Sequence, residues 1–118
     1  MQSKDSLDGL RAKLDAFAVE RDWAQFHNPK NLVMALSGEV GELTEHFQWL
    51  TPEECERLAA GTRAEVELEI ADVLLFLVRL ADRLGIDPVQ AAEKKLALNA
   101  AKYPVEKSRG KSTKYNKL

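Results

Sequence analysis

The sequence predicts an all-α protein built as a four-helix bundle. Apolar residues recur at intervals of three and four along several long segments, which is the period of one helix face. Proline, glycine and short polar residues stand between these segments, where helices begin and end. No segment shows the alternation of polar and apolar residues expected of a half-buried strand.

The first two predicted helices cover residues 6–22 and 29–50. Ser6 or Asp8 can cap the first helix, because short polar side chains accept hydrogen bonds from free backbone N–H groups. Pro29 cannot continue that helix, but it can open the second, since a proline at the first helical position gives up no hydrogen bond.

A short helical turn and two further helices are predicted after Leu50. Residues 51–54 read Thr-Pro-Glu-Glu, the order of a helix start, and this turn should fade near Gly61. The third long helix covers residues 63–84, and the fourth covers 88–103. Glycine after the third helix and proline after the fourth are typical helix ends.

Composition and charge suit one domain with a basic end. The chain has 118 residues, 45% of them hydrophobic, and a net charge of −2, so it lacks the overall basic charge of a nucleic-acid binder. The charged residues between 102 and 118 are nevertheless lysine and arginine, apart from Glu106. We expect a helical domain over residues 1–104 and an irregular basic tail over 105–118, which is either solvated or bound to an anion.

Other sequence features favour the cytoplasm. No apolar run reaches the roughly 18 residues of a membrane span. The first ten residues, MQSKDSLDGL, contain no apolar signal core. Cys55 is the only cysteine, so the chain forms no internal disulfide. We expect a cytoplasmic protein without a membrane or a nucleic acid polymer as its partner.

The third predicted helix is apolar almost all round. Leu68 and Leu75 point away from Val66, Val73 and Leu77 at 100° per residue. A surface helix of a small monomer should have one apolar stripe only. We therefore expect an obligate oligomer with this helix at its centre.

Four acids lie on the faces of the second and third helices. Glu39 falls inside the stripe formed by the leucines of ALSGEVGELTEHFQWL (35–50), and Glu42 lies at its edge. Glu69 and Asp72 have the same i, i+3 spacing on the third helix. The sequence thus places two pairs of carboxylates on two long helices that are expected to be antiparallel neighbours.

Such a group of acids needs positive charge if it is buried. Arg63 and Arg79 are nearby cations, but neither lies between the pairs. Oxygen ligands without a cysteine or histidine pattern suit Mg²⁺ or Mn²⁺. The alternative is a solvent-exposed polar stripe.

Longer segments carry a family resemblance. They read ERDWAQFHNPKNLVMALSGEVGELTEHFQW at 20–49, ELEIADVLLFLVRLA at 67–81, and KLALNAAKYP and KSTKY at 95–104 and 111–115. In these segments the chain resembles the MazG-like, all-α nucleoside triphosphate pyrophosphohydrolases, most closely their dCTP pyrophosphatase branch. The resemblance spans nearly the whole chain, and the block FHNPKNL, GEVGEL, FQW is far more specific than one ExxE pattern.

The resemblance implies a reaction and its cofactor. The family cleaves a nucleoside triphosphate between the α and β phosphates, giving the monophosphate and pyrophosphate. Mg²⁺ is its cofactor, with Mn²⁺ as a possible substitute, and its metal-binding acids correspond to Glu39, Glu42, Glu69 and Asp72. Glu39 or Glu42 is the expected acceptor of the water's proton. Family members assemble as homodimers or homotetramers.

The resemblance also implies the residues that bind the nucleotide. Trp23, Trp49 and Phe76 correspond to an aromatic cage around the base. Lys95 and Asn99 match nucleotide contacts. The C-terminal residues expected near the triphosphate are Lys102, Tyr103, Lys111, Lys114 and Tyr115. His27, near a turn, either contacts substrate or forms a structural hydrogen bond.

Departures from the family leave the base open. Some members have a histidine where Leu14 stands and a tyrosine where Phe76 stands. The expected substrate is dCTP or a modified dCTP, and the alternatives are dUTP or a broad range of dNTPs. A non-catalytic nucleotide-binding oligomer is a further alternative. A di-metal redox protein is disfavoured, because its Glu-x-x-His motif is absent.

Overall fold

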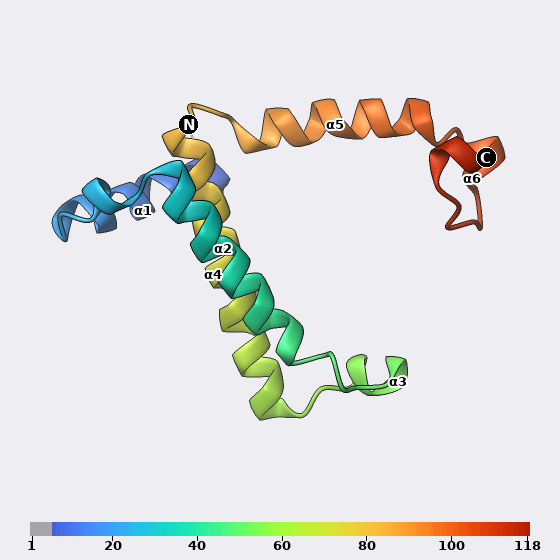
Figure 1. The fold of residues 1–118 in the computed structure, drawn as a ribbon, viewed down its shortest axis with the longest axis horizontal. Helices are drawn as coiled ribbons and strands as arrows, with labels where there is room; N and C mark the ends of the chain where they lie inside the picture. Colours follow the sequence, from blue (N-terminus) through green and yellow to red (C-terminus); the bar gives the residue numbers. More distant parts are fainter. Residues whose placement is uncertain (1–5) are drawn as a thin grey trace. The chain divides into compact units, whose positions relative to one another are not determined.

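The computed structural model describes residues 6–118 and is all-α over that range, as predicted (Figure 1). Four helices have fourteen residues or more: α1 (Leu7–Glu20), α2 (Pro29–Glu45), α4 (Ala60–Arg83) and α5 (Pro88–Lys102). The shorter elements are η1 (Ala24–Phe26), α3 (Pro52–Cys55), α6 (Val105–Ser108) and η2 (Tyr115–Lys117). None of the helices in this range is long and apolar enough to cross a bilayer.

The chain divides into two compact units. The first ends at Ile86, and the second is Asp87–Leu118. In the first unit α2 and α4 run side by side in opposite directions, joined through α3, and α1 packs against α4 (Figure 1). The predicted helical domain over residues 1–104 and tail over 105–118 stay a prediction.

The helix starts follow the capping chemistry of the sequence. Ser6 Oγ accepts a hydrogen bond from the Gly9 amide at 2.9 Å, so Ser6 is the N-cap of α1. Asn28 caps α2, with Pro29 at the first helical position. Thr51 and Glu54 form a reciprocal capping box at α3, as the sequence predicts.

Helix ends were predicted less well. The second helix was expected to reach Leu50, but α2 ends at Glu45. Its last turn tightens, because the His46 amide bonds to the Leu43 carbonyl and the Phe47 amide to the Thr44 carbonyl. Trp49 therefore lies in a turn and not on the helix.

Two further expectations were wrong. The third long helix begins at Ala60, before the expected start at residue 63, and includes Gly61. A glycine is tolerated there because the first turn of a helix has few internal hydrogen bonds to weaken. The segment after Pro104 is not all irregular, since the Pro104 carbonyl accepts hydrogen bonds that open α6.

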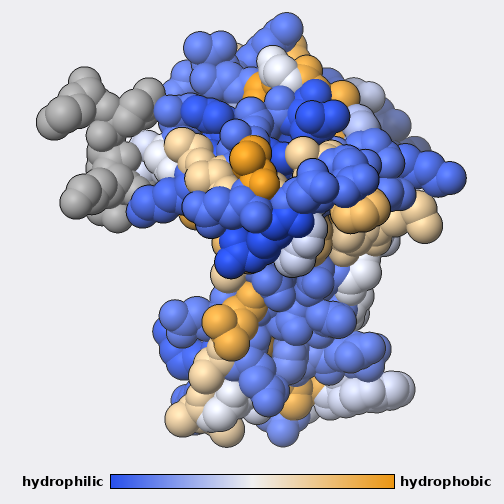
Figure 2. All heavy atoms as spheres, turned by 90° about the vertical axis from the view of Figure 1, so that its left-hand side faces the viewer, coloured by the Kyte–Doolittle hydropathy of each residue, from blue (hydrophilic) through white to orange (hydrophobic). Residues whose placement is uncertain are grey.

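The core of the first unit is small. Its buried apolar residues are Ala18, Leu32, Val66, Val78 and Ala81. Large apolar side chains remain exposed on α4, where Leu68 is 68% exposed. Figure 2 shows apolar side chains lying among polar ones on one face of the molecule. These exposed residues agree with the predicted oligomer, which stays a prediction.

Candidate metal and nucleotide site

Three carboxylates from two helices come together in the first unit. Glu39 lies on α2, and Glu69 and Asp72 lie one turn apart on α4. One carboxylate oxygen of each residue lies within 4.8 Å of the others. The antiparallel packing of α2 and α4 therefore brings three of the four predicted acids to one point.

The carboxylates of this cluster are partly buried and have no positive partner. The Oε2 atoms of Glu39 and Glu69 are buried and accept no hydrogen bond within residues 6–118. Over the same residues, no lysine or arginine forms an ion pair with Glu39, Glu69 or Asp72. Unpaired buried carboxylate oxygens are costly, so the donor set fits a divalent cation that prefers oxygen ligands.

Burial and neighbouring acids raise the pKa values of Glu39 and Glu69. Desolvation raises the pKa of Glu39 to about 7, with further contributions from hydrogen bonds to Glu42 and Glu69 and from the charge of Asp72. Desolvation is the largest cause that raises the pKa of Glu69, and the interactions with Glu42 and Asp72 raise it further, whereas the interaction with Glu39 lowers it. Without a cation, Glu39 therefore keeps its proton to a higher pH than an ordinary glutamate does.

Glu42 borders the cluster without completing it. It is exposed, and its oxygens are not among the three that lie within 4.8 Å of one another. It lies close enough to raise the pKa values of both Glu39 and Glu69. Its predicted roles as ligand and as base remain predictions.

Trp23 is held at the start of the segment that leads into α2. Its backbone N–H donates to the Ala18 carbonyl at 2.9 Å, after Asp22 turns the chain with a φ of 54°. Its ring meets Phe17 edge-on with centroids 5.6 Å apart, and His27 with centroids 6.4 Å apart. The side chain is still 43% exposed, so it can stack on a ligand.

The structure does not bring Trp49 to Trp23 within one chain. Trp23 precedes α2 and Trp49 follows it, so the 17 residues of that helix separate them. At 1.5 Å per residue this is about 25 Å. Trp49 is 86% exposed and makes no ring contact with the described residues. Phe76 lies one turn after Asp72 on α4 and is partly exposed.

The second unit contains the other predicted nucleotide contacts. Lys95, Asn99 and Lys102 share one face of α5, because they are spaced by four and three residues. Lys102 Nζ lies 4.8 Å from the ring centroid of Tyr115, which also meets the Tyr103 ring edge-on at 6.1 Å. Lys111 and Lys114 are exposed on the segment before η2.

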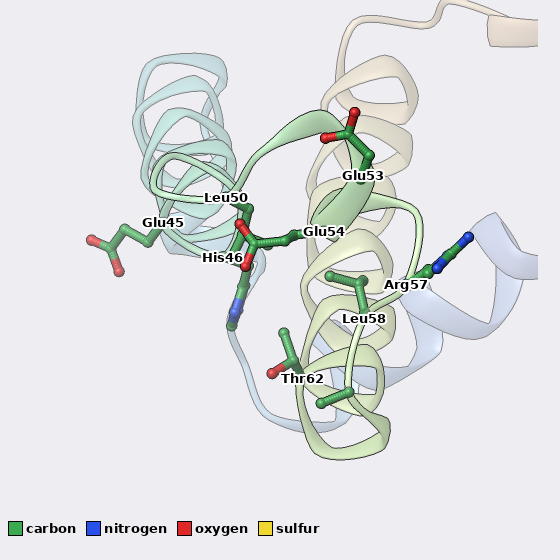
Figure 3. Close-up of a pocket in the computed structure, with 9 residues that line it drawn as sticks. Glu45, His46, Leu50, Glu53, Glu54, Arg57, Leu58 and Thr62 are labelled. Atoms are coloured by element: carbon green, nitrogen blue, oxygen red, sulfur yellow. The ribbon is translucent and has the colours of Figure 1, made fainter.

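A separate pocket of about 600 Å³ lies where the end of α2, α3 and the start of α4 meet (Figure 3). Its lining includes both signs of charge, with Glu45, His46 and Arg57 among the residues. None of the four predicted metal ligands lines it. We assign it no function.

A polar cluster next to Trp23 was not predicted from the sequence. Arg79, only 3% exposed, donates to Asp15 Oδ1 at 2.6 Å and to His27 Nδ1 at 3.1 Å. An arginine inside the apolar stretch of α4 was the signal, but it was considered only as a partner of the metal-binding acids. Arg79 instead pairs with an acid of α1.

Comparison with known proteins decides the family. A model of the MazG-like family matches residues 34–118, which include all four acids. This chain belongs to the MazG-like family.

Relatives named dCTP pyrophosphatase 1 match this MazG-like chain over almost its full length. It is 45% identical over 118 residues to dCTP pyrophosphatase 1 of Bos taurus, covering 98% of this chain and 70% of the relative. The Homo sapiens dCTP pyrophosphatase 1 is 44% identical over 115 residues, covering 96% and 68%. A dATP/dGTP diphosphohydrolase of Cyanophage S-2L is 46% identical over 50 residues, covering 42% and 48%.

A solved structure shares the fold of this MazG-like chain. It is a pyrophosphatase from Archaeoglobus fulgidus DSM 4304, with a TM-score of 0.80 and 38% sequence identity. The match covers 88% of this chain and 97% of that one. The arrangement of helices described above is therefore found in a pyrophosphatase.

Proposed function

We propose that this MazG-like enzyme hydrolyses dCTP, or a modified dCTP, to the monophosphate and pyrophosphate in the free nucleotide pool of the cytoplasm. The observation that supports this most is the cluster of Glu39, Glu69 and Asp72, with its two buried, unpaired oxygens. Relatives named dCTP pyrophosphatase 1, at 44–46% identity over nearly the whole chain, support the reaction and the substrate.

Glu39, Glu69 and Asp72 would hold Mg²⁺, and Glu42 would join them. Bound there, the metal neutralises phosphate charge and polarises the α-phosphoryl group. Without metal, the negative charges of the acids would repel a triphosphate. Bound metal would neutralise these charges, so that the substrate can bind. Mn²⁺ prefers the same oxygen ligands and is expected to substitute.

Glu39 and Glu42 are the candidates for the general base. Either carboxylate accepts the proton of the attacking water if it is not fully used as a ligand. Glu42 is better placed, because it borders the cluster from an exposed position. Glu39 has a pKa of about 7 in the metal-free protein, which also suits proton transfer near neutral pH.

Aromatic and basic side chains complete the nucleotide site. Trp23 stacks on the base from its exposed face, and Phe76 closes the cage. Trp49 comes from a second copy of the chain, because one chain keeps the two tryptophans about 25 Å apart. The phosphates are bound by the C-terminal residues Lys95, Asn99, Lys102, Tyr103, Lys111, Lys114 and Tyr115.

A substrate panel tests this function. Pyrophosphate release is measured for dCTP, modified dCTP, dUTP, the purine dNTPs and the NTPs, with Mg²⁺ and with EDTA. We expect Mg²⁺-dependent release that is fastest with dCTP. Equal release from all dNTPs would support the broad alternative, and fastest release from dUTP would assign that substrate. No release would favour a non-catalytic nucleotide-binding oligomer.

A further inference from the structure

His27 is anchored from one side by a buried arginine. Arg79 Nε donates to His27 Nδ1 at 3.1 Å. Arginine remains protonated and has no acceptor, so it can only donate in this contact. His27 Nδ1 is therefore the acceptor and carries no proton, which makes the ring a neutral imidazole with its proton on Nε2.

Ion pairs keep Arg79 in this position. Arg79 Nη1 lies 2.6 Å from Asp15 Oδ1 on α1 and 3.5 Å from Asp82 Oδ2 on its own helix. Arg11 reaches the same Asp82 at 3.7 Å. Asp15 and Asp82 neutralise the buried guanidinium and fix its position. The Nε atom of Arg79 therefore stays directed at His27.

The free nitrogen of His27 faces away from this cluster. Nε2 lies across the ring from Nδ1, and no hydrogen-bond partner for it occurs in residues 6–118. His27 is only partly buried, and its ring lies edge-on to Trp23 with centroids 6.4 Å apart. A base stacked on Trp23 would therefore lie beside the His27 ring.

We propose that Arg79 is a positioning residue that holds His27 in its Nε2–H tautomer, so that His27 presents a fixed hydrogen-bond donor to an acceptor of the base stacked on Trp23. This rests on the proposed nucleotide function. Cytosine offers O2 and N3 as acceptors at its edge. Stacking tolerates any base, so a fixed donor beside Trp23 adds the directional contact that stacking lacks.

Nitrogen-15 NMR of histidine-labelled protein tests the tautomer without nucleotide. We expect an acceptor-type Nδ1 and a protonated Nε2 for His27 at pH 7, and a mixture of tautomers in Arg79→Lys, which keeps a cation for Asp15. His46, which has no arginine partner within residues 6–118, is the internal control. A proton on Nδ1 of wild-type His27, or an unchanged single tautomer in Arg79→Lys, would overturn the positioning role.

Two isosteric variants separate the two nitrogens of His27. Asparagine places an acceptor near Nδ1, and glutamine places a donor near Nε2. We expect His27→Gln to bind dCMP within about threefold of wild type and His27→Asn to bind about tenfold more weakly, the size of one lost hydrogen bond. Calorimetric titration with dCMP measures both.

The outcomes distinguish this inference from the proposed function. If wild type binds dCMP and the two variants bind equally, the donor role is wrong and the function stands. If wild type binds no dCMP and releases no pyrophosphate, the function and the donor role both fail. The nitrogen-15 NMR measurement of the His27 tautomer depends on neither dCMP binding nor pyrophosphate release.

Discussion

Glu39 links the stability of the metal-free protein to pH. Its pKa is raised from 4.5 to about 7, so between these values the folded chain keeps a proton that the unfolded chain has released. The folded state then binds more protons, and stability falls as pH rises through this window. Below pH 4.5 the full contribution of Glu39 to the stability of the folded state is present, and above about pH 7 this contribution is lost.

We therefore expect the melting temperature in EDTA to fall from pH 5 to pH 7. Mg²⁺ should reverse most of this fall at pH 7, because it replaces the proton. Glu39→Gln should remove most of this fall, and Glu67→Gln, on an exposed part of α4, is the matched control. A flat profile in EDTA for a protein that also carries His27→Asn would contradict the raised pKa of Glu39.

His27 changes the pH dependence of folding stability in the opposite direction. Desolvation, followed by the charges of Arg79 and Arg83, lowers its pKa from 6.5. The unfolded chain gains this proton first as pH falls, so this contribution is present above pH 6.5 and is lost in acid. The two slopes overlap, and the pH profile should be measured with and without His27→Asn.

Asp22 turns the chain in front of Trp23 in the left-handed region, with a φ of 54°. Glycine adopts this conformation freely and a β-branched residue does not. Asp22→Gly should therefore change stability little, whereas Asp22→Val should lower it by about 1–2 kcal/mol. Urea denaturation followed by tryptophan fluorescence compares the two, and equal stabilities would argue against this backbone conformation.

Two glycines in α2 have open space beside them. A Cβ at Gly38 or Gly41 would meet no atom within 4 Å. Glycine inside a helix costs about 0.5–1 kcal/mol relative to alanine. We expect Gly41→Ala to raise the unfolding free energy of the isolated chain by that amount, as measured in urea. Lower stability in the assembled protein would instead show that a second chain packs against this glycine.

Local sequence signals predicted helix starts better than helix ends. Caps such as Ser6 and Thr51 act within three residues, so their hydrogen bonds can be inferred from sequence. The end of α2 depends on i−3 hydrogen bonds at Leu43 and Thr44, for which the sequence has no glycine or proline signal. α6 was missed because Pro104 suggested a stop but also serves as an N-cap.

The candidate site was also predicted only in part. Spacing placed Glu39, Glu69 and Asp72 on helix faces, and the structure brings them together. Periodicity could not show that Arg79 pairs with Asp15 and His27, because these residues are 64 and 52 positions away in sequence. Such pairing depends on how α1 packs against α4.

At the scale of the whole molecule, we expect a homodimer or homotetramer. The apolar side chains exposed on α4, among them Leu68 and Ile70, would be costly to leave in water. Light scattering measures the mass directly. A stable monomer at working concentration would contradict both the assembly and a shared aromatic cage.

Mixing two inactive variants tests whether the site is shared. Trp49→Ala lacks the aromatic contribution, and Glu69→Gln lacks a metal ligand. In a mixed dimer one site has intact acids from one chain and an intact Trp49 from the other. Random exchange should restore about a quarter of wild-type activity, because half of the dimers are mixed and one of their two sites is complete. No recovery despite subunit exchange would place Trp49 in the site of its own chain or outside it.

The role of the acid cluster is best tested by pyrophosphate release from dCTP by wild type, Glu69→Gln and the control Glu67→Gln, each with Mg²⁺ and with EDTA. We expect Mg²⁺-dependent release by wild type and Glu67→Gln, and a loss of at least about a hundredfold in Glu69→Gln with its helical content unchanged. Near wild-type release by Glu69→Gln, or release that persists in EDTA, would contradict this role.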